Sequence, residues 1–141
     1  MAPVFNSIFP WNQELISTYP LLTDGELESR IADAGAAYAG WKNKSFTKRG
    51  VILKKTAVIL RRDKEALGSL ITREMGKLIS ESRAEIEKCA WVCDYYAENG
   101  ELFLKDELIE AGYTKSLVSF EPIGAVLAIM PWNFPFWQVF R

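Results

Sequence analysis

Apolar side chains recur at helical spacing after the first twenty residues of the chain. Thr23 and Glu26 form a T-x-x-E capping box, which marks the start of a helix. Apolar residues then follow at the spacing i, i+4, i+7, i+11 and i+14. They are Leu27, Ile31, Ala34, Tyr38 and Trp41. This continuous stripe predicts a helix over residues 24–41 with one face buried.

Three further helices are predicted between residues 47 and 100. The first spans residues 47–62, and its broad buried side consists of Val51, Leu53, Ala57, Val58 and Leu60. The second spans residues 64–75 and ends at Gly76. The third begins near Ser80 or Ser82 and ends at Asn99 and Gly100. Its apolar face consists of Ile86, Cys89, Ala90, Cys93 and Ala97. Core packing is therefore expected for both thiols.

Shorter extended segments flank the helices. Residues 4–7 and 14–19 read as two strands around a turn at residues 10–13, although a loosely held arm is the alternative. Residues 101–115 form a charged connection with helical or turn character around 107–112. Polar and apolar side chains then alternate over residues 114–120, which predicts a strand.

Residues 123–130 are all apolar or glycine, and the pattern indicates a strand buried on both faces. Pro131 ends this strand, and Pro135 fits the first turn of a following helix. Asn133 lies between the two prolines, where a strand turns into a helix. Ligands bind at that position in open α/β sheets, so Asn133 is a candidate ligand contact. A helix cap is the alternative role.

A membrane-spanning helix is a second reading of this region, because residues 122–140 carry no charged side chain. Pro131 and Pro135 would break such a helix in its middle and free carbonyl groups that lipid cannot satisfy. We therefore expect no membrane span.

Composition and charge narrow the function classes. The chain has 141 residues, 17 basic and 18 acidic side chains and a net charge of −1, so neither nucleic acid nor an acidic membrane is an expected partner. It contains no histidine, and we expect no metal site. Residues 1–10 lack the pattern of a secretory signal, and two cysteines four residues apart rarely form a disulfide. A reduced cytoplasmic protein is therefore expected.

The segment from Glu74 to Lys77 could suggest a phosphate loop. The G-x-x-x-x-G-K-[ST] spacing is absent, so the sequence does not support that reading. Lys77 is instead expected to have a structural role between two helices.

The residues around Asn133 also resemble a known family. Glu121-Pro122-Ile123-Gly124, followed by the run from Ile129 to Pro135, is similar to the first half of NAD(P)-dependent aldehyde dehydrogenases. The continuation to Arg141 looks most like the succinate-semialdehyde dehydrogenase branch. The resemblance covers the whole chain but only about the first third of a full-length family member.

The resemblance implies an α/β fold of which this chain is the N-terminal part. Residues 1–113 would form the hairpin and the helical part of the cofactor-binding domain, and residues 114–122 a strand of the oligomerisation sheet. Residues 123–141 would form the first strand of the Rossmann-like sheet and the start of the next helix. The catalytic domain would be absent from these residues, and a full-length protein would be a homo-oligomer, either a dimer or a tetramer.

The resemblance also assigns roles to site residues. Asn133 matches the family asparagine whose amide stabilises the oxyanion formed when a cysteine attacks an aldehyde. The backbone that passes the nicotinamide ribose matches Ile129, Met130, Pro131 and Trp132, next to Asn133. NAD or NADP is thus the implied cofactor, and the sequence does not decide between them.

Substrate contacts are expected on the following helix. Phe134, Gln138 and Arg141 follow at i, i+4 and i+7 and would share one face. In the family this face lines the aldehyde tunnel, and Arg141 matches the position that binds the distal carboxylate of succinate semialdehyde. A surface arginine at a helix end is the alternative, and Trp137 suits the core as well as the pocket.

The resemblance places the nucleophilic cysteine and the general-base glutamate beyond Arg141. We therefore expect an N-terminal part of an enzyme that oxidises a small carboxylated aldehyde, inactive by itself. The alternative is a non-catalytic module that assembles with intact subunits through the strand at residues 114–120.

Overall fold

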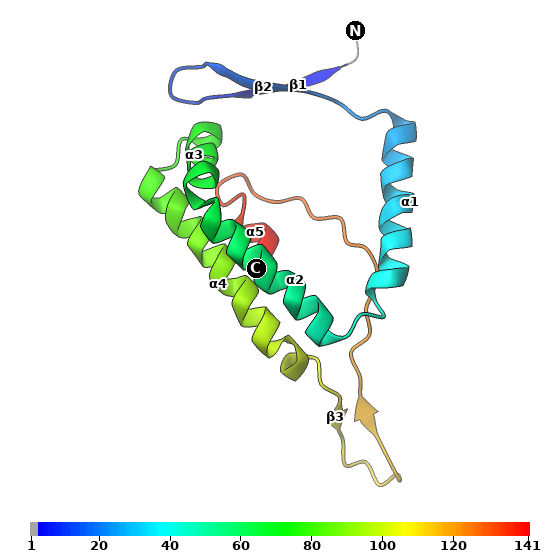
Figure 1. Cartoon of the computed structure of the whole chain (residues 1–141). Helices are drawn as coiled ribbons and strands as arrows, with labels where there is room; N and C mark the ends of the chain where they lie inside the picture. Colours follow the sequence, from blue (N-terminus) through cyan, green and yellow to red (C-terminus); the bar gives the residue numbers. More distant parts are fainter. Residues whose placement is uncertain (1–2) are drawn as a thin grey trace.

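Three helices form the packed centre of the computed structural model, which describes residues 3–141. They are α2 (Phe46–Arg62), α3 (Lys64–Met75) and α4 (Ile79–Phe103). Helices α2 and α4 run side by side, and α3 packs on the first part of α4 (Figure 1). The buried apolar cluster between them consists of Ala57, Leu60, Ile71, Ile86, Cys89, Ala90 and Cys93. The predicted helices and the buried position of both thiols are confirmed.

Local signals explain where these helices begin and end. The Ser45 hydroxyl accepts a hydrogen bond from the Lys48 N–H at 3.3 Å and so caps α2. Gly76 has a φ of 76°, a left-handed conformation that suits glycine and stops α3 where the sequence predicts. Helix α4 continues past the predicted end at Gly100 to Phe103, because one glycine weakens a helix without ending it.

Helix α1 (Asp24–Trp41) forms as predicted but is not covered. Its Thr23–Glu26 capping box is present, and the helix lies apart from the three-helix centre (Figure 1). No residue of α1 is buried, so the prediction of a buried stripe is wrong for this chain. The same correction applies to Val51 and Val58 of α2, which are exposed because no element among residues 3–141 packs over them.

The N-terminal hairpin is confirmed as β1 (Val4–Ile8) and β2 (Leu15–Pro20), which pair antiparallel. A bulge interrupts the register between Ser7 and Ile8. Ser7 is buried, and its hydroxyl donates a hydrogen bond to the Glu74 carboxylate near the end of α3. The hairpin is therefore attached to the helices and is not a loose arm.

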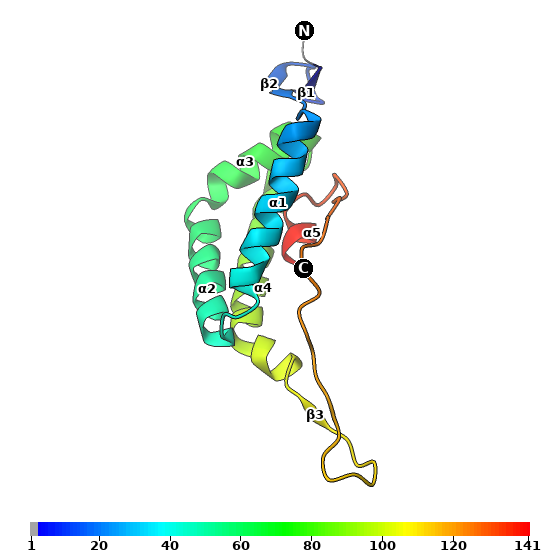
Figure 2. The same ribbon diagram turned by 90° about the vertical axis from the view of Figure 1, so that its right-hand side faces the viewer.

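A second hairpin replaces part of the predicted charged connection. Strands β3 (Glu107–Leu108) and β4 (Leu117–Val118) pair antiparallel, and this hairpin extends away from the helices (Figure 2). Of the helical or turn character predicted around residues 107–112, the structure has no helix: residues 107 and 108 pair with the alternating segment that follows, and the chain bends from residue 111. The strand predicted at residues 114–120 is correct in type but is paired over two residues only.

Residues 123–131 form no strand, contrary to the prediction. The segment is extended and its side chains are exposed, with Ile129 86% exposed. A strand needs a neighbour to pair with its N–H and C=O groups, and none of the other described segments lies in register beside it. The following helix, α5 (Trp137–Phe140), packs against the buried cluster between the helices.

The remaining expectations from the sequence concern membrane and metal. Among residues 3–141, no helix has both the length and the apolar composition needed to cross a membrane. The described residues also contain no cluster of three or more histidine, cysteine, aspartate or glutamate side chains that could hold a metal. Residues 1 and 2 lie outside the part of the chain that the structure describes. They belong to the predicted 1–113 unit and to the segment considered for a secretory signal.

Candidate functional site

The candidate site is the turn at residues 131–136 that leads into α5. The helix begins at Trp137 and not at Pro135, so Phe134 and Arg141 flank it instead of sharing its face with Gln138. The Phe134 carbonyl still accepts the Gln138 N–H at 3.2 Å, which continues a helical turn back to residue 134. The Arg141 N–H reaches the Trp137 carbonyl at 3.0 Å in the same way. These hydrogen bonds extend helical backbone by a few residues on either side of α5.

A buried carboxylate on α4 holds this turn in place. One oxygen of Glu85, Oε1, accepts the backbone N–H groups of Phe136 and Trp137, both at 3.0 Å. The other oxygen, Oε2, accepts a hydrogen bond from the Lys77 ammonium, with an N–O distance of 2.5 Å. The Glu85 side chain is 1% exposed, and a buried charge of this kind is tolerated only with a partner and satisfied hydrogen bonds. All three donors provide that compensation.

Lys77 comes from the short segment between α3 and α4, and its side chain is 8% exposed. Its Nζ lies 3.5 Å from the Asn133 carbonyl oxygen and 3.6 Å from the centroid of the Phe134 ring. An ammonium above an aromatic face gains electrostatic stabilisation. The structural role expected for Lys77 therefore includes direct contact with the candidate site.

A cavity of about 320 Å³ lies beside the turn. It is lined by Lys77, Glu81, Ala84, Glu85, Lys88, Phe134 and Trp137. Lys88 Nζ lies 3.8 Å from the centroid of the Trp137 ring. Phe134 and Trp137, which the sequence marks as possible pocket residues, are thus brought together by contacts with α4.

The side chain of Asn133 is exposed and makes no hydrogen bond with any residue in the described part of the chain. Its backbone carbonyl alone is engaged, by Lys77. The amide therefore does not cap α5, whose start has no side-chain cap hydrogen bond. An unpaired carboxamide on a fixed backbone is available to donate to a ligand.

The other predicted contacts are spread along the same segment. Ile129, Pro131 and Trp132 are exposed, and Met130 is 38% exposed. The backbone N–H and C=O groups of residues 129–132 form no hydrogen bond within the described chain. Gln138 is half-buried, while Arg141 is exposed and its guanidinium forms no ion pair among the described residues.

The two cysteines do not suit nucleophilic chemistry in this fold. Burial raises the pKa of the Cys89 thiol to about 12, and the nearby Glu85 carboxylate adds to the increase. Burial likewise raises the pKa of Cys93. The thiolate is the reactive species, so both groups stay protonated and inert at neutral pH. Their expected packing role is confirmed.

Glu85 is the functional candidate that the sequence reasoning missed. The signal was available, because Glu85 precedes Ile86 and lies inside the apolar stripe that includes Cys89. A carboxylate within a buried helix face must have partners. Those partners are at residues 77, 136 and 137, outside helix α4, so the spacing of apolar residues along that helix cannot identify them.

Comparisons with known proteins define the class. The profile of the aldehyde dehydrogenase family matches residues 2–141, and the chain therefore belongs to this family. A probable succinate-semialdehyde dehydrogenase (NADP+) of Synechocystis is 37% identical over 96% of this chain and 30% of its own length. A succinate semialdehyde dehydrogenase (NAD(P)+) of Escherichia coli is 38% identical over 96% of this chain and 29% of its own length.

Solved structures agree with the sequence matches. A succinic semialdehyde dehydrogenase from Streptococcus pyogenes, in complex with NADP+, superposes with a TM-score of 0.91 and 31% identity. The match covers 96% of this chain and 30% of that one. A betaine aldehyde dehydrogenase from Staphylococcus aureus in complex with NAD+ gives a TM-score of 0.87 at 30% identity, covering 96% and 28% of the two chains. The arrangement of elements, with its α/β character, is thus that of the N-terminal part of the aldehyde dehydrogenase fold, and the chain spans about 30% of the length of these relatives.

Proposed function

We propose that this chain is the N-terminal part of an NAD(P)-dependent aldehyde dehydrogenase that oxidises a small carboxylated aldehyde such as succinate semialdehyde. The observation that carries the proposal is the exposed, unpaired amide of Asn133 on a turn whose backbone is hydrogen-bonded to the buried Glu85. A preorganised amide of this kind stabilises the oxyanion of a tetrahedral intermediate by about 3–4 kcal/mol. The names of the similar proteins support the substrate class.

The described residues fit one part of a dinucleotide site. Residues 129–131 are extended and their backbone polar groups are unpaired, and Trp132 is exposed beside them, as expected of a wall along the nicotinamide end. No glycine-rich helix start suited to a pyrophosphate occurs among residues 3–141. NAD or NADP supplies the hydride acceptor when bound. Residues 129–133 would contribute only contacts to its nicotinamide side.

Arg141 is the proposed specificity residue of the same site. Its guanidinium is exposed and free of ion pairs within the described chain, so it is available to a distal carboxylate. A bidentate arginine–carboxylate contact would distinguish succinate semialdehyde from an uncharged aldehyde of similar length. Phe134 and Gln138 would contact the chain of the same substrate.

A polypeptide of residues 1–141 is proposed to be inactive by itself. Catalysis in this family requires a nucleophilic cysteine. The two thiols present are buried, and their pKa is raised. Helix α1 and residues 123–131 expose apolar side chains that are normally covered in a larger protein. This exposure supports the view that residues 1–141 are one part of an enzyme.

The proposal is tested with a chimera in which residues 1–141 replace the matching part of the Escherichia coli relative. We expect the chimera to reduce NAD(P)+ with succinate semialdehyde and the 141-residue chain to show no turnover. Asn133→Ala should lower kcat by about 10²–10³-fold with little change in KM. An unchanged kcat would exclude the oxyanion role.

Arg141→Ala is tested in the same chimera. We expect KM for succinate semialdehyde to rise by about 10- to 100-fold, since a hydrogen bond between charged groups is worth roughly 1.5–3 kcal/mol. Butanal, which lacks the carboxylate, is the matched control and should show an unchanged KM. Equal effects on both aldehydes, or none on either, would contradict the proposed contact.

The second candidate function is a non-catalytic module that assembles with intact subunits. The observation that favours it is the β3–β4 hairpin, which extends into solvent with Leu108, Leu117 and Val118 exposed (Figure 2). Such a hairpin could add to a neighbouring sheet, and the homo-oligomer proposed for a longer protein would use the same strand. Co-purification of the 141-residue chain with the intact Escherichia coli relative, lost on Leu117→Lys, would support this function over the first.

A further inference from the structure

The two oxygens of one buried carboxylate have separate tasks. Glu85 Oε1 accepts the N–H groups that open α5, at residues 136 and 137, each at 3.0 Å. Glu85 Oε2 accepts Lys77 Nζ at 2.5 Å. The glutamate thus joins helix α4 to the backbone three and four residues after Asn133.

Lys77 contacts the same turn from its other end. Its Nζ approaches the Asn133 carbonyl oxygen at 3.5 Å and the Phe134 ring at 3.6 Å from the centroid. The pair therefore contacts residues 133, 134, 136 and 137. Pro135, which lies between these contacts, is a proline and has no backbone N–H to donate.

We propose that Glu85 and Lys77 are positioning residues that aim the Asn133 amide, an inference that rests on the oxyanion role proposed above. The Asn133 side chain makes no hydrogen bond within the described chain, so its direction is determined by its backbone. That backbone follows the unpaired segment 123–131, which provides no support of its own. The Glu85–Lys77 pair is the polar anchor observed on this turn.

A charged pair suits this task better than an apolar contact would. Burying both charges costs free energy that the mutual attraction rarely exceeds, so such a pair is weak evidence for stability alone. The Glu85 carboxylate accepts hydrogen bonds from three donors, one at residue 77 and two at residues 136 and 137. Hydrogen bonds are directional, whereas apolar packing is not, so they fix the turn in one orientation. Misplacing a reacting group by about 1 Å can cost about 10²-fold in rate.

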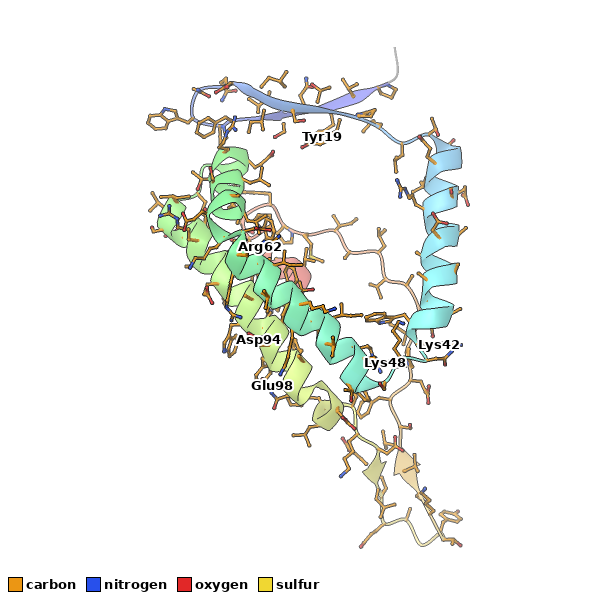
Figure 3. All side chains as sticks on the ribbon, viewed as in Figure 1. Tyr19, Lys42, Lys48, Arg62, Asp94 and Glu98 are labelled. Atoms are coloured by element: carbon orange, nitrogen blue, oxygen red, sulfur yellow. The ribbon has the colours of Figure 1, made fainter. Side chains whose placement is uncertain are left out.

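The test compares Glu85→Ala and Glu98→Ala in the chimera. Glu98 lies on the same helix and pairs with Lys54 at 3.3 Å, but on an exposed flank away from the turn (Figure 3). We expect Glu85→Ala to lower kcat by about 10- to 100-fold with KM changed less than about threefold, and Glu98→Ala to change neither. Glu85→Gln keeps an acceptor for the two N–H groups and should lose less than Glu85→Ala.

A double substitution separates positioning from a structural role. If Glu85 acts through Asn133, then Glu85→Ala added to Asn133→Ala should lower kcat no further. Additive losses would overturn the positioning role and leave the proposed function intact. An unchanged kcat in Asn133→Ala alone would overturn the proposed function and the positioning role with it.

Amide hydrogen exchange supplies a readout that does not depend on turnover. In the 141-residue chain, the peptide containing the Phe136 and Trp137 amides should exchange at least tenfold faster after Glu85→Ala, because these N–H groups lose their acceptor. Peptides of α2 should be unchanged, which also shows that the variant folds, and Glu98→Ala should leave the turn protected. Unchanged exchange at residues 136 and 137 would overturn the inference.

Discussion

The three-helix centre and the uncovered elements around it have similar apolar patterns in the sequence, but only the centre buries its apolar side chains. Helices α2, α3 and α4 cover one another and bury Ile71, Ile86 and Cys89. Helix α1 has an equally regular apolar stripe and a complete capping box, yet none of its residues is buried. Residues 123–131 are the most apolar run in the chain and remain exposed. Periodicity thus marks the face that needs a partner, and burial follows only where the partner is present.

The largest difference in stability should come from replacing a buried and an exposed isoleucine. Ile86 in α4 is fully buried, whereas Ile129 is mostly exposed. Ile86→Ala should lower the free energy of unfolding by about 2–5 kcal/mol, because it removes packed methyl groups and leaves a cavity. Ile129→Ala should change it by less than about 0.5 kcal/mol. Urea unfolding followed by circular dichroism measures both, and similar losses would contradict the described burial.

The uncovered segment should instead control association. Residues 123–131 expose Ile123, Val126 and Leu127, and we expect the 141-residue chain to self-associate at micromolar concentration. Leu127→Lys should weaken association by about 10- to 100-fold, the equivalent of one large side chain removed from a contact at roughly 1.5–3 kcal/mol. Sedimentation across a concentration series measures this. A wild-type chain that stays a compact monomer would contradict the expectation.

Two glycines, one in a packed helix and one in the uncovered helix α1, allow the same comparison for helix packing. A Cβ at Gly50 in α2 would lie 3.1 Å from the Ala97 carbonyl oxygen in α4, while nothing lies within 4 Å of one at Gly35 in α1. Gly50→Ala should therefore cost about 1–3 kcal/mol by forcing the helices apart. Gly35→Ala should be neutral or stabilise by up to about 1 kcal/mol through helix propensity. Thermal unfolding of both variants would detect a reversal of this order.

The smallest expected effect is a change in the stability of the helical core with pH, measured between pH 9 and 10. Burial raises the pKa of Cys89 from its ordinary value of 9.0 to about 12, so the folded thiol stays protonated where the unfolded one ionises. The stability from Cys89 is present below pH 9 and is lost as pH rises toward 12, by at most about 1.4 kcal/mol per pH unit.

Cys89→Ala is the matched control for this pH dependence. Its free energy of unfolding should fall less steeply than that of the wild type between pH 9 and 10. Equal slopes for the two proteins would show that Cys89 ionises as easily in the fold as in the unfolded chain.

Much of the fold was predictable because its signals are local. The capping box at Thr23, the glycine stop at Gly76 and the apolar stripes located four helices, all of which the structure contains. These signals act within one turn of a helix and need no distant partner. The β3–β4 hairpin was missed in part, because pairing between residues 107 and 118 depends on contacts across the connecting loop.

The candidate site was only partly predictable for the same reason. Asn133 was identified from the proline-bracketed motif and its resemblance to a family, and the structure leaves its amide exposed and unpaired. Glu85 and Lys77 were not identified as a pair, since they lie eight residues apart and meet residues about fifty positions downstream. The start of α5 was misplaced by two residues, because these long-range hydrogen bonds determine where the turn closes.

The amino-acid sequence alone determined the helices, their capped ends, the apolar faces and membership of a recognisable family, because each depends on neighbouring residues or on a contiguous motif. Tertiary structure alone decided which apolar faces are covered and which carboxylate holds the Asn133 turn. Burial and long-range hydrogen bonds require two surfaces to meet, and one segment does not specify whether its partner is there.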